Sequence, residues 1–186
     1  TTPKSYSALT DGPHTFAVRA KDPSGNVDAT PASASWNIDA TPPAIAFTVK
    51  PAITAANETA YALAGTCSDN GIALTVQIGS LAATLTGPCG TPAAGQFATV
   101  PMDLTSLAQG PVTLQASMTD AAGNSTSITD ATTKDTLGPA LTIDTLDVIN
   151  NANKASYGFT GGCETAGGSV AFTLTSGTTV SGTTSC

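Results

Sequence analysis

The sequence predicts an all-β protein of tandem β-sandwich repeats, and three features predict it: composition, an internal repeat and the strand pattern. The 186 residues are rich in threonine and include 18 Gly and 12 Pro, whereas only 10% are charged and only two are glutamate. Helical proteins favour Glu, Lys, Arg and Leu, while Thr with Gly and Pro turns favours short strands. The hydrophobic fraction of 40% exceeds that of a disordered acidic tail, so we expect the chain to fold.

The charge balance argues against two classes of partner. Six Lys and Arg against 13 Asp and Glu give a net charge of -7 and a pI near 4.2. Binding to nucleic acid or to an anionic membrane surface needs clustered cations. We therefore expect no nucleic-acid partner, and the lack of a long apolar run predicts no membrane insertion.

An internal repeat of about 96–98 residues organises the chain. At an offset of 96 residues Cys67 aligns with Cys163, and at an offset of 98 residues Gly12-Pro13 aligns with Gly110-Pro111. Such self-similarity is typical of tandem arrays. We predict the C-terminal half of a repeat over 1–42, a complete repeat over 43–138 and the N-terminal half of a further repeat over 139–186.

Proline-containing segments mark both boundaries, at 39–43 and 135–139. Proline fixes φ, biases the preceding residue towards extended geometry and removes a donor, which suits short stiff linkers.

The complete repeat shows strand signals in order. Ile45, Phe47 and Val49 alternate with smaller residues, as expected of a strand buried on one face, and a Gly79-Ser80 turn separates two later strands. The expected strands cover residues 45–49, 61–67, 74–78, 81–85, 97–104, 112–118 and 127–133. Seven short strands in under 100 residues predict an immunoglobulin-like sandwich. The Cys…Trp…Cys spacing of antibody domains is absent, because Trp36 lies in the preceding half-repeat.

The four cysteines favour disulfides over a metal site. There is no C-x-x-C pair, and His14 is the only histidine, which argues against structural zinc. Four cysteines allow three pairings, but nearly equal spacings favour one bridge per repeat, Cys67–Cys89 and Cys163–Cys186. Stable bridges predict an oxidising location, extracellular or at the cell surface.

Two segments carry a family resemblance. Residues 11–26 and 109–124 both contain Gly-Pro at a strand start and end in Asp-x-x-Gly-Asn, the second time as Asp120-Ala121-Ala122-Gly123-Asn124. This pattern resembles the penultimate strand and turn of bacterial Ig-like repeats, which form tandem arrays in large secreted or surface-anchored proteins, often adhesins. The resemblance implies a non-catalytic structural or adhesive stalk, whose partners are neighbouring repeats of the same or an adjacent chain and a surface protein or glycan ligand.

The Asp-x-x-Gly-Asn motifs have two interpretations. In the first, Asp22 and Asp120 cap backbone N–H groups of tight turns, while Gly and Asn supply positive φ. In the second they bind calcium, because further carboxylates follow in the chain. These carboxylates are Asp28, Asp39, Asp130 and Asp135. No D-x-D-x-D-G loop is present, so we favour the turn and expect no cofactor.

No catalytic constellation is evident, and we expect no enzyme activity. His14 is the only imidazole base, and no G-x-S-x-G turn accompanies it. Glu58 and Glu164 are assigned to equivalent loop positions of different repeats, so they should not form a carboxylate pair.

The aromatic residues have two interpretations as well. Tyr61 and Tyr157 occupy one equivalent position and are expected in the core, and Trp36 is expected to cover a sandwich end. Together with Tyr6 they leave a carbohydrate-binding accessory module of a secreted enzyme as an alternative. A further alternative is a fibre subunit assembled by strand complementation between chains, because the two half-repeats would complete each other.

Overall fold

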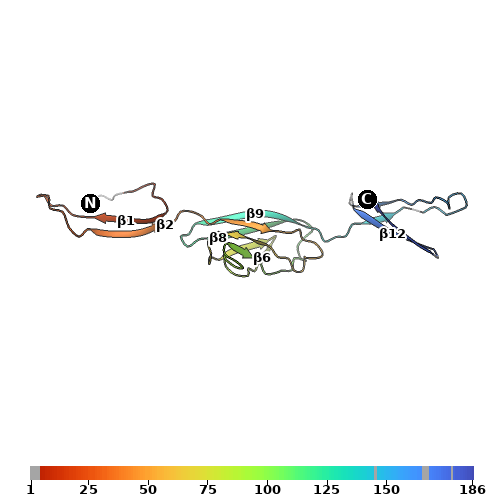
Figure 1. The fold of residues 1–186 in the computed structure, drawn as a ribbon, viewed down its shortest axis with the longest axis horizontal. Coiled ribbons are helices and arrows are strands. Elements are labelled where there is room, and N and C mark those ends of the chain that lie inside the picture. Colours follow the sequence, from red (N-terminus) through yellow and green to blue (C-terminus); the bar gives the residue numbers. More distant parts are fainter. Residues whose placement is uncertain (1–4, 145, 165–167, 177) are drawn as a thin grey trace. The chain divides into compact units, whose positions relative to one another are not determined.

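The computed structural model describes residues 5–144, 146–164, 168–176 and 178–186, and every regular element of these residues is a β-strand (Figure 1). The described part of the chain contains no helix long and apolar enough to cross a membrane. The chain divides into two compact units, Thr1–Thr136 and Leu137–Cys186. The fold is therefore all-β, as predicted.

The first unit begins with an antiparallel hairpin of β1 (Gly12–Val18) and β2 (Ala32–Ile38). The complete repeat follows with seven strands in two sheets. One sheet has the order β3-β4-β7 and the other the order β6-β5-β8-β9. The strands are β3 (Ile45–Val49), β4 (Ala64–Cys67), β5 (Leu74–Ile78), β6 (Leu81–Ala83), β7 (Gln96–Ala98), β8 (Gly110–Thr119) and β9 (Ser125–Lys134).

One hydrophobic core lies between these two sheets. On β5 the side chains of Leu74, Val76 and Ile78 are buried while Thr75 and Gln77 are exposed, and β8 alternates in the same way. Phe97 from the other sheet is fully buried in the same cluster. Alternation of this kind places one face of each sheet in the core, which defines a β-sandwich. The immunoglobulin-like assignment stays a prediction.

Two of the observed strands are shorter than expected. The stretch predicted over 97–104 forms a strand only as far as Ala98, and beyond it Thr99 and Met102 make isolated bridges. Pro101 lies between these bridges and has no N–H to continue a ladder. The strand predicted from Tyr61 starts at Ala64, and Tyr61 itself makes an isolated bridge to Met102.

The second unit contains two antiparallel pairs. The first joins β10 (Leu141–Ile143) to β11 (Gly161–Cys163), and the second joins β12 (Ser169–Ser176) to β13 (Thr178–Ser185). Both predicted disulfides are present, Cys67–Cys89 and Cys163–Cys186, each with a Cα–Cα distance of 6.0 Å.

Equivalent residues, 96 positions apart in the sequence, make the same contacts within each unit. The Tyr61 hydroxyl donates to the Pro51 carbonyl, and the Tyr157 hydroxyl donates to the Asp147 carbonyl. A Cβ added to Gly65 would lie 2.2 Å from the Ala46 carbonyl oxygen, and one added to its counterpart Gly161 would lie 2.0 Å from that of Thr142. The internal similarity of the sequence is therefore also a similarity of local structure.

Candidate functional site: the repeat junctions

The two Asp-x-x-Gly-Asn motifs form tight turns. Asp22 accepts hydrogen bonds from the Asn26 backbone N–H and side-chain amide, both at 2.8 Å. Asp120 accepts the same pair of bonds from Asn124, at 2.8 and 2.9 Å. In both turns the bonds from asparagine lower the pKa of the aspartate below its usual range. The carboxylate groups therefore act as backbone caps within these turns.

One part of the turn prediction was wrong. Gly25 and Gly123 adopt positive φ, at 95° and 96°, whereas the asparagines do not. Because the Asn side chains are tied to aspartate, their role is hydrogen bonding rather than backbone freedom.

The other carboxylates proposed for calcium have partners of their own. Asp28 accepts from the Thr30 N–H, Asp39 accepts from the Thr41 N–H, and Asp130 forms an ion pair with Lys50. Across the described residues no group of three or more His, Cys, Asp or Glu side chains is arranged to hold a metal ion. The carboxylates of Asp22 and Asp120 thus accept the hydrogen bonds that hold their own turns.

A first contact, which we call the upstream clamp, holds each linker as it leaves the last strand of a repeat. Asp11 accepts from the Ala40 N–H at 2.9 Å and from the Thr41 hydroxyl at 2.5 Å. Gln109 accepts from the Thr136 N–H at 3.0 Å and donates to the Thr136 hydroxyl at 2.7 Å. Asp11 and Gln109 are 98 residues apart and both precede a Gly-Pro pair, so the clamp is a feature of the repeat.

A second contact, the downstream clamp, holds the linker where the next repeat begins. The Ala44 N–H donates to the Ser68 hydroxyl at 2.9 Å, and Ser68 returns a backbone bond to the Ala44 carbonyl at 3.0 Å. The Ala140 N–H donates to the Glu164 carboxylate at 3.0 Å, and Glu164 returns the backbone bond at 3.1 Å. Equivalent positions thus hold both linkers with different side-chain chemistry.

The first linker has an additional tie. The Asn124 side-chain amide donates to the Asp39 carbonyl at 3.0 Å. The Asp-x-x-Gly-Asn turn of the complete repeat therefore contacts the linker that precedes this repeat. Nothing in the motif itself predicted this bond, because Asp39 lies 85 residues away in the sequence.

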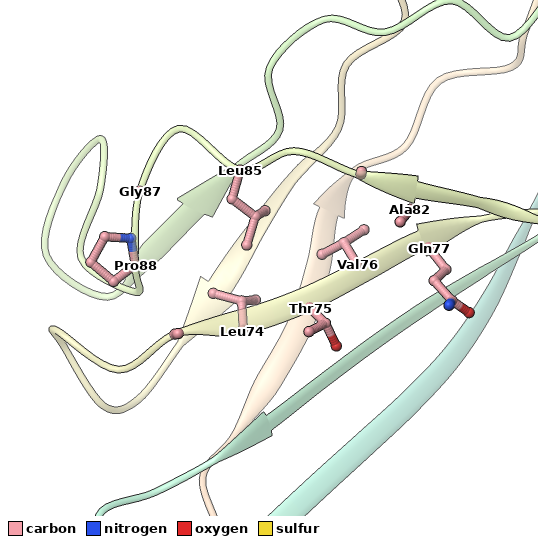
Figure 2. Close-up of a pocket in the computed structure, with 10 residues that line it drawn as sticks. Leu74, Thr75, Val76, Gln77, Ala82, Leu85, Gly87 and Pro88 are labelled. Atoms are coloured by element: carbon pink, nitrogen blue, oxygen red, sulfur yellow. The ribbon is translucent and has the colours of Figure 1, made fainter.

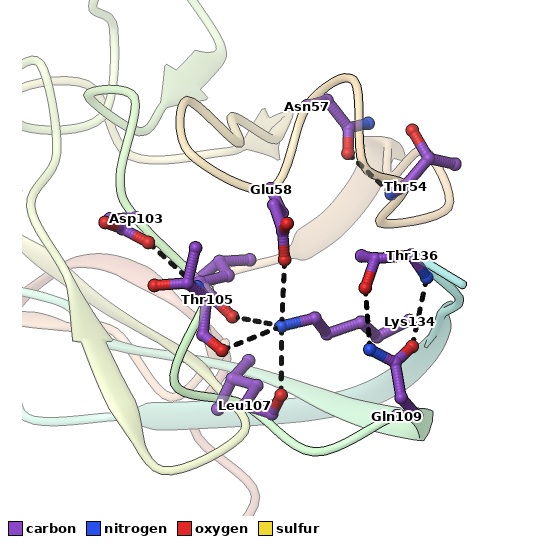
Figure 3. A network of polar contacts seen from close by, with 10 residues as sticks. Thr54, Asn57, Glu58, Asp103, Thr105, Leu107, Gln109, Lys134 and Thr136 are labelled. Atoms are coloured by element: carbon purple, nitrogen blue, oxygen red, sulfur yellow. Dashed lines mark hydrogen bonds and ion pairs between the residues drawn. The ribbon is translucent and has the colours of Figure 1, made fainter. Parts of the chain in front are cut away.

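Lys134 anchors the end of β9 and was missed by the sequence analysis. Its side chain is only 1% exposed, and its ammonium group donates to the carbonyls of Leu104, Thr105 and Leu107 at 2.7, 3.1 and 2.9 Å (Figure 3). Glu58 completes the site with an ion pair at 3.1 Å. A buried cation is tolerated only when it is paired and hydrogen-bonded, as Lys134 is.

The catalytic candidates are not brought together. The His14 ring donates to the Thr10 carbonyl at 2.7 Å and stacks on Trp36 with ring centroids 5.9 Å apart. The expected equivalence of Glu58 and Glu164 was wrong. Glu58 pairs with Lys134, whereas Glu164 occupies the position of Ser68 in the downstream clamp.

One aromatic side chain differs from expectation. Tyr61 is buried as predicted, but Tyr157 is only partly buried. Trp36 lies in the β1–β2 hairpin, where it is 42% exposed and stacked on His14. Tyr6 is 63% exposed and contacts Phe16 edge to face.

An open groove of about 510 Å³ runs along β5 and β6 (Figure 2). Leu74, Val76, Leu85 and Pro88 supply its apolar lining, and Thr75 and Gln77 lie at its side. No titratable or aromatic side chain lines this groove, so it has no groups for acid–base chemistry or for stacking on a sugar ring.

The fold and these contacts define a class: an all-β repeat protein whose linkers are held by side chains of the flanking repeats. No protein-family model matches the chain, and no curated protein matches it. One solved structure is described as the crystal structure of a tetra-tandem repeat in the extending region of a large adhesion protein. It is 26% identical, and the match covers 96% of this chain and 46% of that one, with a TM-score of 0.46. At that TM-score the likeness carries no conclusion about the fold or function of this chain.

Proposed function

We propose that this chain is a non-catalytic structural segment of a large extracellular bacterial surface protein, in which tandem repeats form a stalk that holds an adhesive part away from the cell. The observation that carries the proposal is the recurrence of the clamps. Asp11 and Gln109 occupy equivalent positions, and each holds the backbone of the linker that leaves its repeat. Side chains that restrain a linker serve an extended array, whereas a flexible tether would not need them.

Two further features support a role under load. Each unit has one disulfide, which closes a loop of 22 or 23 residues. Such a loop cannot be extended by pulling unless the bond is reduced. The linkers also contain proline, which limits the conformations open to an extended segment.

The net charge of -7 favours solubility and disfavours non-specific association.

Single-molecule pulling on the full chain tests the proposal. A load-bearing repeat should unfold in a discrete event whose released length excludes the Cys67–Cys89 loop. A Cys67→Ser/Cys89→Ser variant should release about 75 Å more, since 22 residues extend by roughly 3.3–3.6 Å each. Gradual extension without a discrete event would contradict the stalk. Hydrolysis of an ester, peptide or glycoside that disappears in a His14→Ala variant would contradict it as well.

A further inference from the structure

A loop of the complete repeat contains Asn70-Gly71, the only Asn-Gly pair of the chain. Such a pair is prone to deamidation. The backbone nitrogen of the glycine attacks the side-chain amide carbon of the asparagine, a succinimide ring closes and ammonia leaves. Water then opens the ring to aspartate or isoaspartate. Glycine favours the attack because it has no Cβ and its backbone is flexible. Asn70 and Gly71 are both exposed, so water reaches them.

Both reacting groups of this pair are hydrogen-bonded to one neighbouring segment, which begins at Cys89. The Gly71 N–H, which carries the nucleophilic nitrogen, donates to the Cys89 carbonyl at 2.7 Å. The Asn70 Oδ1 atom, on the carbon that is attacked, accepts from the Gly95 N–H at 2.8 Å. The Asn70 side chain also lies against Gly90, where an added Cβ would be 2.7 Å from Oδ1. The nitrogen must lose the proton that Cys89 accepts, and the amide carbon must move towards it, so these contacts oppose deamidation.

The Cys67–Cys89 disulfide holds the two sides of this loop together. Cys67 lies just before the Asn-Gly pair, and Cys89 supplies the carbonyl that binds Gly71. The Cys89 N–H also donates to the Ile72 carbonyl at 2.9 Å, so the bridge lies directly beside the bonds that restrain the pair. Without the bridge, only hydrogen bonds of an exposed loop join these segments. Such bonds open more readily than the fold as a whole.

We propose that Asn70 is a deamidation site controlled by the Cys67–Cys89 bond. While the bond is intact, the loop is closed and Asn70 persists. A thiol reductant converts the bridge to two thiols and is itself oxidised to a disulfide, and the loop then opens while the two sheets stay packed. The Gly71 nitrogen displaces ammonia from Asn70, and water gives aspartate or isoaspartate.

The modification would outlast the reduction that permits it. Isoaspartate adds its Cβ atom to the main chain, which shifts the Gly71 N–H away from the Cys89 carbonyl. Reoxidation of the cysteines does not reverse this change, so loss of the bridge leaves a covalent mark in the loop. The inference rests on this loop alone and does not depend on the stalk function.

Peptide mapping by mass spectrometry, after incubation of the full chain at mildly alkaline pH, tests the proposal. With the bridge intact, Asn70 should deamidate at least about tenfold more slowly than in a synthetic peptide of residues 68–73, because two hydrogen bonds must open first. In the thiol-reduced chain, and in a Cys67→Ser/Cys89→Ser variant, the rate should rise towards that of the peptide.

Two controls separate opening of the loop from unfolding of the repeat. Lys134→Met destabilises the complete repeat but keeps the bridge, so its oxidised form should still deamidate slowly at Asn70. Asn124, which precedes a serine, should stay unmodified in every form. Hydrogen exchange of the β8 amides reports whether the Cys67→Ser/Cys89→Ser variant remains folded.

Four results would overturn the proposal. The oxidised chain could deamidate as fast as the peptide, or the reduced chain could remain folded and deamidate no faster than the oxidised one. Oxidised Lys134→Met could deamidate as fast as the reduced chain. Finally, β8 amides without protection in the Cys67→Ser/Cys89→Ser variant would show that the bridge controls the whole fold rather than this loop.

Discussion

Replacing Lys134 with methionine removes a buried cation but keeps a long unbranched side chain. Three carbonyl groups lose their donor, and the Glu58 carboxylate, whose side chain is 21% exposed, loses its counter-ion. Removing one partner of a buried ion pair typically costs about 3–5 kcal/mol. We therefore expect Lys134→Met to lower the free energy of unfolding of the complete repeat by about this amount.

Three comparison variants separate burial from charge. Lys50 pairs with Asp130 at the surface, with both side chains more than a third exposed, so Lys50→Met should cost only about 0–1 kcal/mol. Glu58→Gln leaves Lys134 with its three carbonyl acceptors and should cost about 1–3 kcal/mol. The double variant Lys134→Met/Glu58→Gln should cost less than the sum of the single changes. Each single change leaves one charged group without its partner, whereas the double variant leaves no charge at this site.

The assay is hydrogen exchange of the β8 and β9 backbone amides, measured by mass spectrometry on the full chain. Tryptophan fluorescence is unsuitable because Trp36 lies in β2. A loss of 3 kcal/mol corresponds to roughly a hundredfold faster exchange of the most protected amides. Equal exchange in Lys134→Met and Lys50→Met would refute the view that Lys134 holds the end of β9.

Two further predictions concern a linker clamp and a glycine. The bonds from the Thr41 hydroxyl and the Ala40 N–H lower the pKa of Asp11. The upstream clamp should therefore be fully formed at any pH above the ordinary aspartate pKa, and it should be lost as the pH falls through the lowered pKa. The NMR shift of the Ala40 amide should report this titration, and Asp11→Asn should abolish it; a midpoint at the ordinary value would show that the clamp does not form. Gly65→Ala should destabilise the complete repeat by about 1–3 kcal/mol, since its Cβ would lie 2.3 Å from the Phe97 ring. A Cβ added at Gly138 meets nothing within 4 Å, so Gly138→Ala should leave the stability unchanged in thermal unfolding followed by far-UV circular dichroism. Equal stability of the two variants would contradict the close contact between Gly65 and Phe97.

Periodicity predicted the strands whose two faces differ most. Residues 45–49 and 74–78 match β3 and β5, because alternation of buried and exposed side chains leaves a direct trace in sequence. The stretch after Ala98 lacks that trace, since Pro101 breaks the ladder while Leu104 still enters the core. The nearly equal cysteine spacings predicted the correct disulfides, because one bridge per repeat is the pairing that a repeated structure allows.

The contacts that hold the linkers are harder to predict from the sequence. Asp11 and Gln109 differ chemically, as do Ser68 and Glu164, although each pair performs the same contact. The available signal was positional: each member of the first pair directly precedes Gly-Pro. Lys134 had no such signal. A lysine at a strand end is normally exposed, and its burial depends on carbonyl groups of a loop about 30 residues away.

The stiffness of the first linker tests the central claim most directly. Spin labels at Ala34→Cys in β2 and Thr129→Cys in β9 would report the distance across the first linker, residues 39–43, by pulsed electron paramagnetic resonance, since the native cysteines are bridged. The clamps predict a narrow distance distribution in the otherwise unaltered chain. Asp11→Ala combined with Asn124→Ala removes two of the linker's ties and should broaden it. A broad distribution before these substitutions, or one whose width they leave unchanged, would contradict a stalk built from clamped repeats.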